Sequence, residues 1–128
     1  MTADLQPASA TVPAFRVTPD AFVDMPGMDV PGTLGFIKDV YENPDDSVMC
    51  SGFFELKHTD EPLEYLYEYD EMKVVLEGEF LLVNVDTGQE VVARKHDAIF
   101  FPKGSRIAFS TPDRALAFYA GHRDATLL

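Results

Sequence analysis

Short apolar runs alternate with polar turns along most of the chain. Glycine, proline, asparagine or aspartate occurs in most of these turns, and long helical periodicity is absent, so the pattern predicts an antiparallel sandwich or barrel. We expect strands over residues 34–41, 48–57, 63–69, 72–76, 80–85, 90–94, 98–101, 106–110 and 115–121. Residues 15–17 are expected to form a first edge strand, and residues 19–23 at most one or two helical turns.

Residues 63–69, Leu-Glu-Tyr-Leu-Tyr-Glu-Tyr, carry a tyrosine at every second position from 65 to 69. Successive residues of a strand point to opposite faces, so Tyr65, Tyr67 and Tyr69 are expected to share one face. If the alternation continues, Glu71 and Lys73 follow on the same face. The pattern therefore predicts a group of polar side chains that point into the barrel.

The length of 128 residues predicts a single domain. Residues 1–13 are expected to form a flexible arm and residues 14–128 the folded domain. The segment between them is rich in apolar residues that so short a barrel would bury poorly: Phe15, Phe22, Val23, Met25 and Met28. Burial against a second copy would also protect exposed sheet edges, so we expect a homodimer.

Charge and cysteine content narrow the classes of partner. A net charge of −12 and a pI near 4.4 disfavour nucleic acid and anionic membrane surfaces, which need basic patches. The single cysteine, Cys50, excludes an intrachain disulfide and is expected to be a small buried hydrophobe. No apolar run approaches about 18 residues and the N-terminus lacks a signal-peptide pattern, so we expect a cytoplasmic protein.

Two spaced motifs connect the chain to a known family. Glu71 is followed by six residues and then Gly78, and Pro102-Lys103-Gly104 closes a later apolar strand. With Tyr69-Asp70-Glu71, Leu76-Glu77-Gly78-Glu79, Phe101-Pro102-Lys103-Gly104-Ser105 and Thr111-Pro112, the chain resembles the cupin superfamily, and most closely the ethanolamine-utilisation Q-type (EutQ-like) small cupins. The resemblance covers roughly the C-terminal two thirds of the chain. It implies an all-β, single-domain cupin with an antiparallel β-barrel or jelly-roll fold.

The resemblance also bears on metal binding. Most cupins hold a divalent metal with two histidines and a glutamate from the first motif and one histidine from the second. The corresponding positions here fall near Tyr65 and Tyr67, at Glu71 and at Ile107, so one ligand of the four remains. We therefore expect neither a metal nor another cofactor. Q-type cupins also lack the histidines; the resemblance implies association with bacterial microcompartments and an acetate-kinase-like activity, although their sizeable N-terminal region is nearly absent here.

The inward-facing polar residues are the candidates for catalysis. A carboxylate buried beside a lysine is a candidate general acid or base, and a tyrosine beside it can donate to a developing oxyanion. We therefore assign Glu71, Tyr67, Tyr65 and Lys73 as the catalytic candidates of a metal-independent isomerase, lyase or cyclase that acts on a small organic metabolite. The alternative is a polar cluster whose members only satisfy one another inside a narrow barrel.

Further residues are expected to contact the substrate. These substrate-binding candidates are Phe53, Glu55, His58, Phe101, Arg106 and Ile107. Alternation allows Glu55 to face inward but cannot choose the face. His58 precedes a turn at the barrel mouth and is either a rim ligand or a solvated residue. Arg106 would bind an anionic group at the rim or form a surface salt bridge.

Two other functions are compatible with the pattern. One is a non-catalytic ligand-binding or scaffold cupin of the ethanolamine-utilisation type. The other is a metal-dependent cupin with a non-standard ligand set drawn from Glu71, His58, Glu55 and the tyrosines. A barrel filled by its own side chains would favour the non-catalytic module, whereas an open cavity at Glu71 would favour the enzyme.

Overall fold

The fold consists of antiparallel strands. A computed structural model describes residues 14–43 and 48–123, so the predicted arm at residues 1–13 lies outside the described part. Its strands are β1 (Leu34–Glu42), β2 (Cys50–Lys57), β3 (Leu63–Leu66), β4 (Glu71–Glu77), β5 (Glu79–Asn84), β6 (Glu90–Arg94), β7 (Ala98–Phe101), β8 (Arg106–Ser110) and β9 (Arg114–Gly121). The expected strand bounds at 90–94, 98–101 and 106–110 are matched to the residue.

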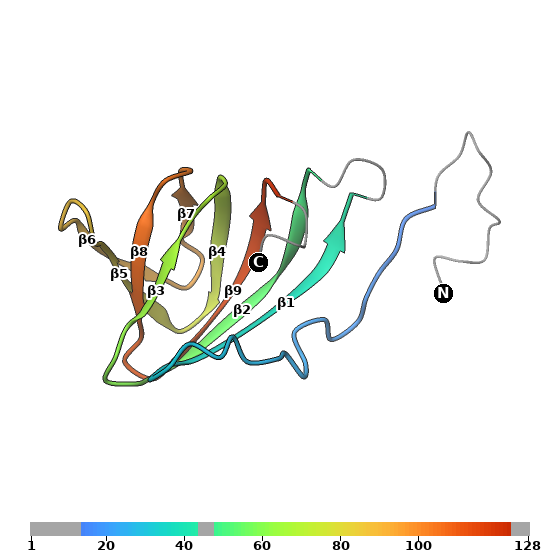
Figure 1. Ribbon diagram of the computed structural model, residues 1–128. Helices are drawn as coiled ribbons and strands as arrows, with labels where there is room; N and C mark the ends of the chain where they lie inside the picture. Colours follow the sequence, from blue (N-terminus) through green and yellow to red (C-terminus); the bar gives the residue numbers. More distant parts are fainter. Residues whose placement is uncertain (1–13, 44–47, 124–128) are drawn as a thin grey trace.

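The strands form two sheets that face each other (Figure 1). One sheet has five strands in the order β1-β2-β9-β4-β7, and the other has four in the order β3-β8-β5-β6. Every strand pairing in them is antiparallel. The expected all-β cupin architecture is therefore confirmed.

The N-terminal side and β3 differ from the expected elements. Residues 15–17 form no strand, and residues 19–24 form turns rather than a helix. β3 ends at Leu66, but the main chain of Tyr67 continues the pairing for one residue, because its N–H donates to Ser105 and its carbonyl accepts from Gly104. Tyr67 and Tyr69 are nevertheless buried and point inward, as the alternation predicted.

The core fills the space between the two sheets. Phe54 of β2 stacks on Phe80 of β5, with ring centroids 5.8 Å apart, and meets Phe109 of β8 edge-on at 5.6 Å. Phe80 and Val75 are fully buried. Both sheets therefore contribute to one core, and polar groups that enter it must find partners there.

Candidate functional site

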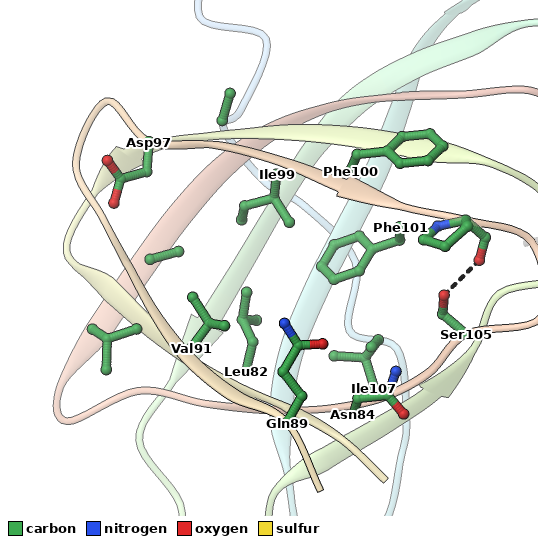
Figure 2. A pocket seen from close by; sticks show the side chains of 14 residues that line it. Leu82, Asn84, Gln89, Val91, Asp97, Ile99, Phe100, Phe101, Ser105 and Ile107 are labelled. Carbon is green, nitrogen blue, oxygen red and sulfur yellow. Dashed lines mark hydrogen bonds between the residues drawn. The ribbon is translucent and has the colours of Figure 1, made fainter. Parts of the chain in front are cut away.

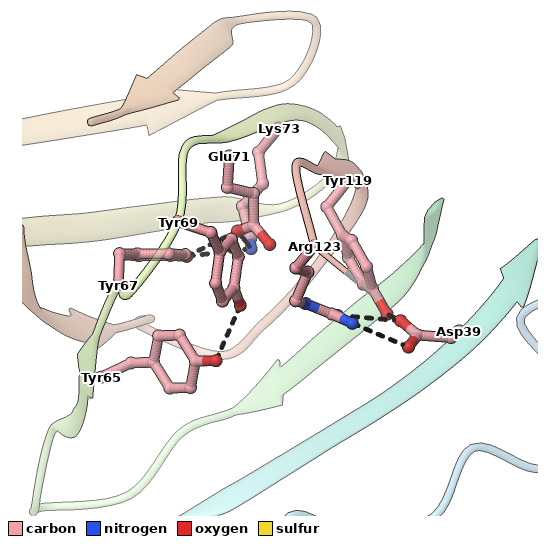
Figure 3. A network of polar contacts seen from close by, with 8 residues as sticks. All are labelled: Asp39, Tyr65, Tyr67, Tyr69, Glu71, Lys73, Tyr119 and Arg123. Carbon is pink, nitrogen blue, oxygen red and sulfur yellow. Dashed lines mark hydrogen bonds and ion pairs between the residues drawn. The ribbon is translucent and has the colours of Figure 1, made fainter. Parts of the chain in front are cut away.

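Three polar side chains meet in the barrel interior. Glu71 and Lys73 lie two residues apart on β4 and both point inward, while Tyr67 precedes that strand (Figure 3). Lys73 Nζ lies 2.5 Å from Glu71 Oε2, the Tyr67 hydroxyl donates to the same oxygen at 2.7 Å, and Lys73 Nζ donates to the Tyr67 hydroxyl at 3.2 Å. All three residues are at most 5% exposed. We refer to them as the Tyr–Glu–Lys cluster.

Aromatic rings surround the Lys73 ammonium. Its Nζ lies 5.2–5.8 Å from the ring centroids of Phe54, Tyr67, Phe101, Phe109 and Tyr119. An ammonium over a ring face is attracted by the ring quadrupole, and more strongly when water is excluded. The rings therefore help to hold the buried charge at one place beside Glu71.

Tyr67 is held in its protonated form. Burial, followed by the negative charge of Glu71, raises the pKa of the Tyr67 hydroxyl well above its ordinary value. A protonated hydroxyl can donate to the carboxylate, as the 2.7 Å contact requires. Tyr67 is thus a built-in hydrogen-bond donor at the cluster.

A second polar group lies beside the first. The hydroxyls of Tyr65 and Tyr69 are 2.7 Å apart, and the guanidinium of Arg123 lies 5.1 Å from the centre of the Tyr69 ring. Arg123 donates to both oxygens of Asp39 at 3.0 Å, and the Tyr119 hydroxyl donates to Asp39 as well (Figure 3). Sequence reasoning missed Arg123 and Asp39, because they are 84 residues apart and no local pattern connects them.

A small cavity adjoins the Tyr–Glu–Lys cluster. Its volume is about 20 Å³, and its lining includes Met28, Tyr65, Glu71 and Lys73. A cavity of roughly 10–15 Å³ or more can hold one water molecule. Both hydrogen bonds to Glu71 reach Oε2, and within the part of the chain that the structure describes Oε1 accepts none. One carboxylate oxygen of Glu71 is therefore left outside the hydrogen bonds of the cluster.

Two of the substrate-binding candidates lie behind the cluster. The Phe101 ring stacks on Tyr67, with centroids 4.8 Å apart and planes 10° from parallel. Ile107 is buried opposite Tyr65 in the pairing of β3 with β8. Neither lines the cavity at Glu71; both line a larger cleft of about 460 Å³ between β6 and β7, which the sequence did not indicate (Figure 2).

The other four candidates lie away from the cluster. On β2 the buried positions are Phe54 and Leu56, so Phe53 and Glu55 occupy the opposite, outer face of the sheet. There Glu55 pairs with Arg114.

The remaining two candidates are at turns and edges. His58 is exposed, and its Nδ1 lies 2.9 Å from the carbonyl oxygen of Thr111. Arg106 forms a surface pair with Glu64 at 3.3 Å.

The non-standard metal set is not assembled. Glu71 lies inside the barrel, Glu55 on its outer face and His58 in a turn. In residues 14–43 and 48–123, no three histidine, cysteine, aspartate or glutamate side chains are grouped so that they could hold a metal ion. Nor does this part of the chain contain a helix long and apolar enough to cross a membrane.

Comparisons with known proteins agree with the fold and the motifs. Residues 12–123 match the family model of the ethanolamine utilisation protein EutQ. The chain is 33% identical over 89 residues to the acetate kinase EutQ of Clostridioides difficile (strain 630), a match that covers 70% of this chain but 54% of that relative. The chain thus spans about half the length of that protein.

Solved structures of EutQ proteins are similar as well. The Clostridium difficile EutQ structure superposes with a TM-score of 0.65 at 29% identity, over 75% of this chain and 67% of the other. An ethanolamine utilisation protein Q from Salmonella typhimurium LT2 gives 0.65 at 25% identity, over 91% of this chain and 84% of the other. On its sequence, its sheets and these similarities, the chain belongs to the EutQ family and has a cupin fold.

Proposed function

We propose that the protein is a metal-independent enzyme that performs acid/base chemistry on a small organic metabolite at the Tyr–Glu–Lys cluster. The observation that carries this proposal is that Glu71, a residue that lines the cavity, has Oε2 held by Lys73 and Tyr67 while Oε1 accepts no hydrogen bond from the described residues. A positioned carboxylate with one oxygen held and one oxygen available is suited to proton transfer.

Each of the three side chains would have its own role in the proton transfer. Glu71 Oε1 accepts a proton from the substrate, which leaves the bonding electron pair on the substrate as an enolate or alkoxide. The Lys73 ammonium lies 2.5 Å from Glu71 Oε2 and supplies positive charge, and Tyr67, whose one O–H donates to the same oxygen, holds the carboxylate in place. Glu71 then returns its proton to a different atom of the product, so that no oxidant or other co-reactant is needed.

Substrate entry requires the barrel mouth to open. A cavity of about 20 Å³ holds a water molecule but no metabolite. Met28 lies over it on a segment that is fastened to β1 by two main-chain bonds, from Met28 to Gly35 at 2.8 Å and from Ile37 to Pro26 at 3.0 Å. We propose that this segment separates from β1 when substrate binds.

The same small cavity supports a second candidate function. A barrel filled by its own side chains and closed by an ion pair suits a non-catalytic ligand-binding or scaffold module of the EutQ type. The two proposals differ in whether any substrate is turned over at Glu71.

Deuterium exchange tests the proposal without knowledge of the substrate. Carbon acids with exchangeable C–H bonds would be incubated with the protein in deuterated buffer containing a chelator and followed by proton NMR. Acetate plus ATP and Mg²⁺ would be assayed separately without chelator, because the relative is called an acetate kinase. We expect exchange or turnover of at least one compound despite the chelator. Tyr67→Phe should slow it by about 10–100-fold, the value of a hydrogen bond to a charged group, because Glu71 loses the donor that positions it.

Tyr41→Phe is the matched control. The Tyr41 hydroxyl lies 2.6 Å from Thr18 on the far side of β1, away from the cluster, so this variant should keep the wild-type rate. Equal rates in wild type and Tyr67→Phe, or no exchange in a broad set of carbon acids, would favour the non-catalytic module. A reaction that is abolished by the chelator would contradict the metal-independent mechanism.

We also propose that the protein is a cytoplasmic homodimer that pairs through the outer face of the five-stranded sheet. Met72 is opposite Phe100 in the pairing of β4 with β7, and these side chains are 62% and 55% exposed. Phe118 of β9 adds a third exposed apolar side chain to the same face. Apolar side chains gathered on one sheet face are typical of an interface.

Met72→Glu should therefore shift the protein from dimer to monomer, because the new charge would have to be buried in the interface. Light scattering at micromolar concentration measures this directly, with Val85→Glu as an exposed control away from that face. A wild-type protein that is already monomeric would rule out the dimer.

A further inference from the structure

The edge strands of the two sheets leave inward-facing residues uncovered. β6 pairs only with β5, and β7 pairs only with β4. Val91 of β6 lies opposite Leu82, a core residue, so both point between the sheets. Val91 is nevertheless 46% exposed, because β7 does not close over it.

This opening forms a cleft between the two edge strands. Its volume of about 460 Å³ falls in the range of roughly 300–1,000 Å³ that is usual for small-molecule sites. Leu82, Phe101 and Ile107 form an apolar floor and are at most 7% exposed (Figure 2). The cleft is therefore a concave pocket backed by the core and not a flat apolar patch.

The lining of the cleft carries a negative charge at one place. Asp97 is the single ionisable side chain among the described residues that line the cleft. Its Oδ2 accepts a hydrogen bond from the main-chain N–H of Arg94 at 2.8 Å, and Oδ1 accepts no hydrogen bond from the described residues.

Neutral amides lie on the other side. Figure 2 shows Asn84 and Gln89 across the cleft from Asp97. The Asn84 Oδ1 already accepts from Asp86 and Thr87, so the amide presents its N–H₂ group.

From the apolar lining and the lone carboxylate we propose that this cleft binds a small amphiphilic amine, with its apolar body on Leu82, Val91 and Ile99 and its ammonium at Asp97. An anionic ligand would meet Asp97 and a chain of net charge −12. The site goes beyond the function proposed above, since the cleft and the cavity at Glu71 share no lining residue.

Three probes of one shape and different charge test the ligand class. Phenylpropylamine, phenylpropanol and phenylpropionate would be titrated into the intact protein at neutral pH and low salt, and binding would be followed by NMR and calorimetry. The amine should bind up to about 5-fold more tightly than the alcohol, which is the value of an exposed ion pair, and the carboxylate more weakly than either. Asp97→Asn should remove the preference for the amine and leave alcohol binding unchanged.

Two valine variants test the location. Val91→Phe fills the cleft without adding charge, and all probes should weaken by at least about tenfold, the equivalent of roughly two buried methylene groups. Val85→Phe is the matched control, because Val85 is 45% exposed and lies outside the cleft.

Three results would overturn the proposal: no probe binds wild type, the carboxylate binds as tightly as the amine, or Val91→Phe and Val85→Phe weaken binding equally. If no probe binds and Val91→Phe also turns a dimeric protein into a monomer, the cleft is instead an interface between two copies.

Discussion

Glu71→Gln should lower the free energy of unfolding by about 3–5 kcal/mol at neutral pH, the usual cost of breaking a buried ion pair. Glutamine keeps the shape of the side chain but leaves the Lys73 ammonium in the barrel without a carboxylate. The rings around Lys73 attract the ammonium but accept no conventional hydrogen bond from it, so the Tyr67 hydroxyl is its one remaining acceptor among the described residues. Both partners are at most 5% exposed, so water cannot compensate.

Urea and thermal unfolding of three variants measure this effect. Glu64→Gln is the control, because Glu64 is in an exposed pair with Arg106 and its loss should cost about 1 kcal/mol or less. The double variant Glu71→Gln, Lys73→Met should recover much of the stability, since no charge is left buried. Unchanged stability in Glu71→Gln alone would show that the ion pair is not the closed contact described here.

The same variant bears on the proposed enzyme. Removal of a general acid or base lowers activity by about 10²–10⁴-fold, so Glu71→Gln should lose exchange activity by that factor. The assay must be run at a temperature where the variant remains folded. A large loss of stability in a protein that shows no catalysed exchange would lead us to abandon the enzyme in favour of the non-catalytic module.

Alkaline pH should unfold the protein steeply. Burial, as the largest cause, raises the pKa of Tyr67, Tyr69 and Tyr119 above the ordinary value near 10. Above pH 10 the unfolded chain therefore releases protons that the native state retains, and the free energy of unfolding falls as pH rises. Below about pH 10 the raised pKa values cost the native state no stability. Above it, the three groups together lower the free energy of unfolding by up to about 4 kcal/mol per pH unit.

Unfolding experiments between neutral pH and pH 12 check the sign and the slope. Tyrosinate absorbance should appear together with the loss of native circular dichroism, because these hydroxyls ionise only when the barrel opens. Tyr69→Phe should reduce the slope by up to about 1.4 kcal/mol per pH unit, the share of one group, while Glu64→Gln keeps it. Full tyrosine ionisation in a protein that is still folded would contradict the prediction.

Local pattern determined the strands and most of the cluster. A strand places every second side chain on one face, so alternation alone assigns Tyr65, Tyr67 and Tyr69 to one face and extends it to Glu71 and Lys73. The motif spacing from Glu71 to Gly78 located the hairpin, because Gly78 adopts a φ of 72° that favours glycine. These features depend on neighbouring residues only.

Tertiary structure decided whatever depends on distant segments. Alternation on β2 left the inner face open, and packing between the sheets chose Phe54 over Phe53 and Glu55. The pairing of Arg123 with Asp39 joins the segment after β9, the last strand, to β1, the first strand. The cleft between β6 and β7 exists because two edge strands from different sheets fail to meet, and no pattern within either strand records that distance.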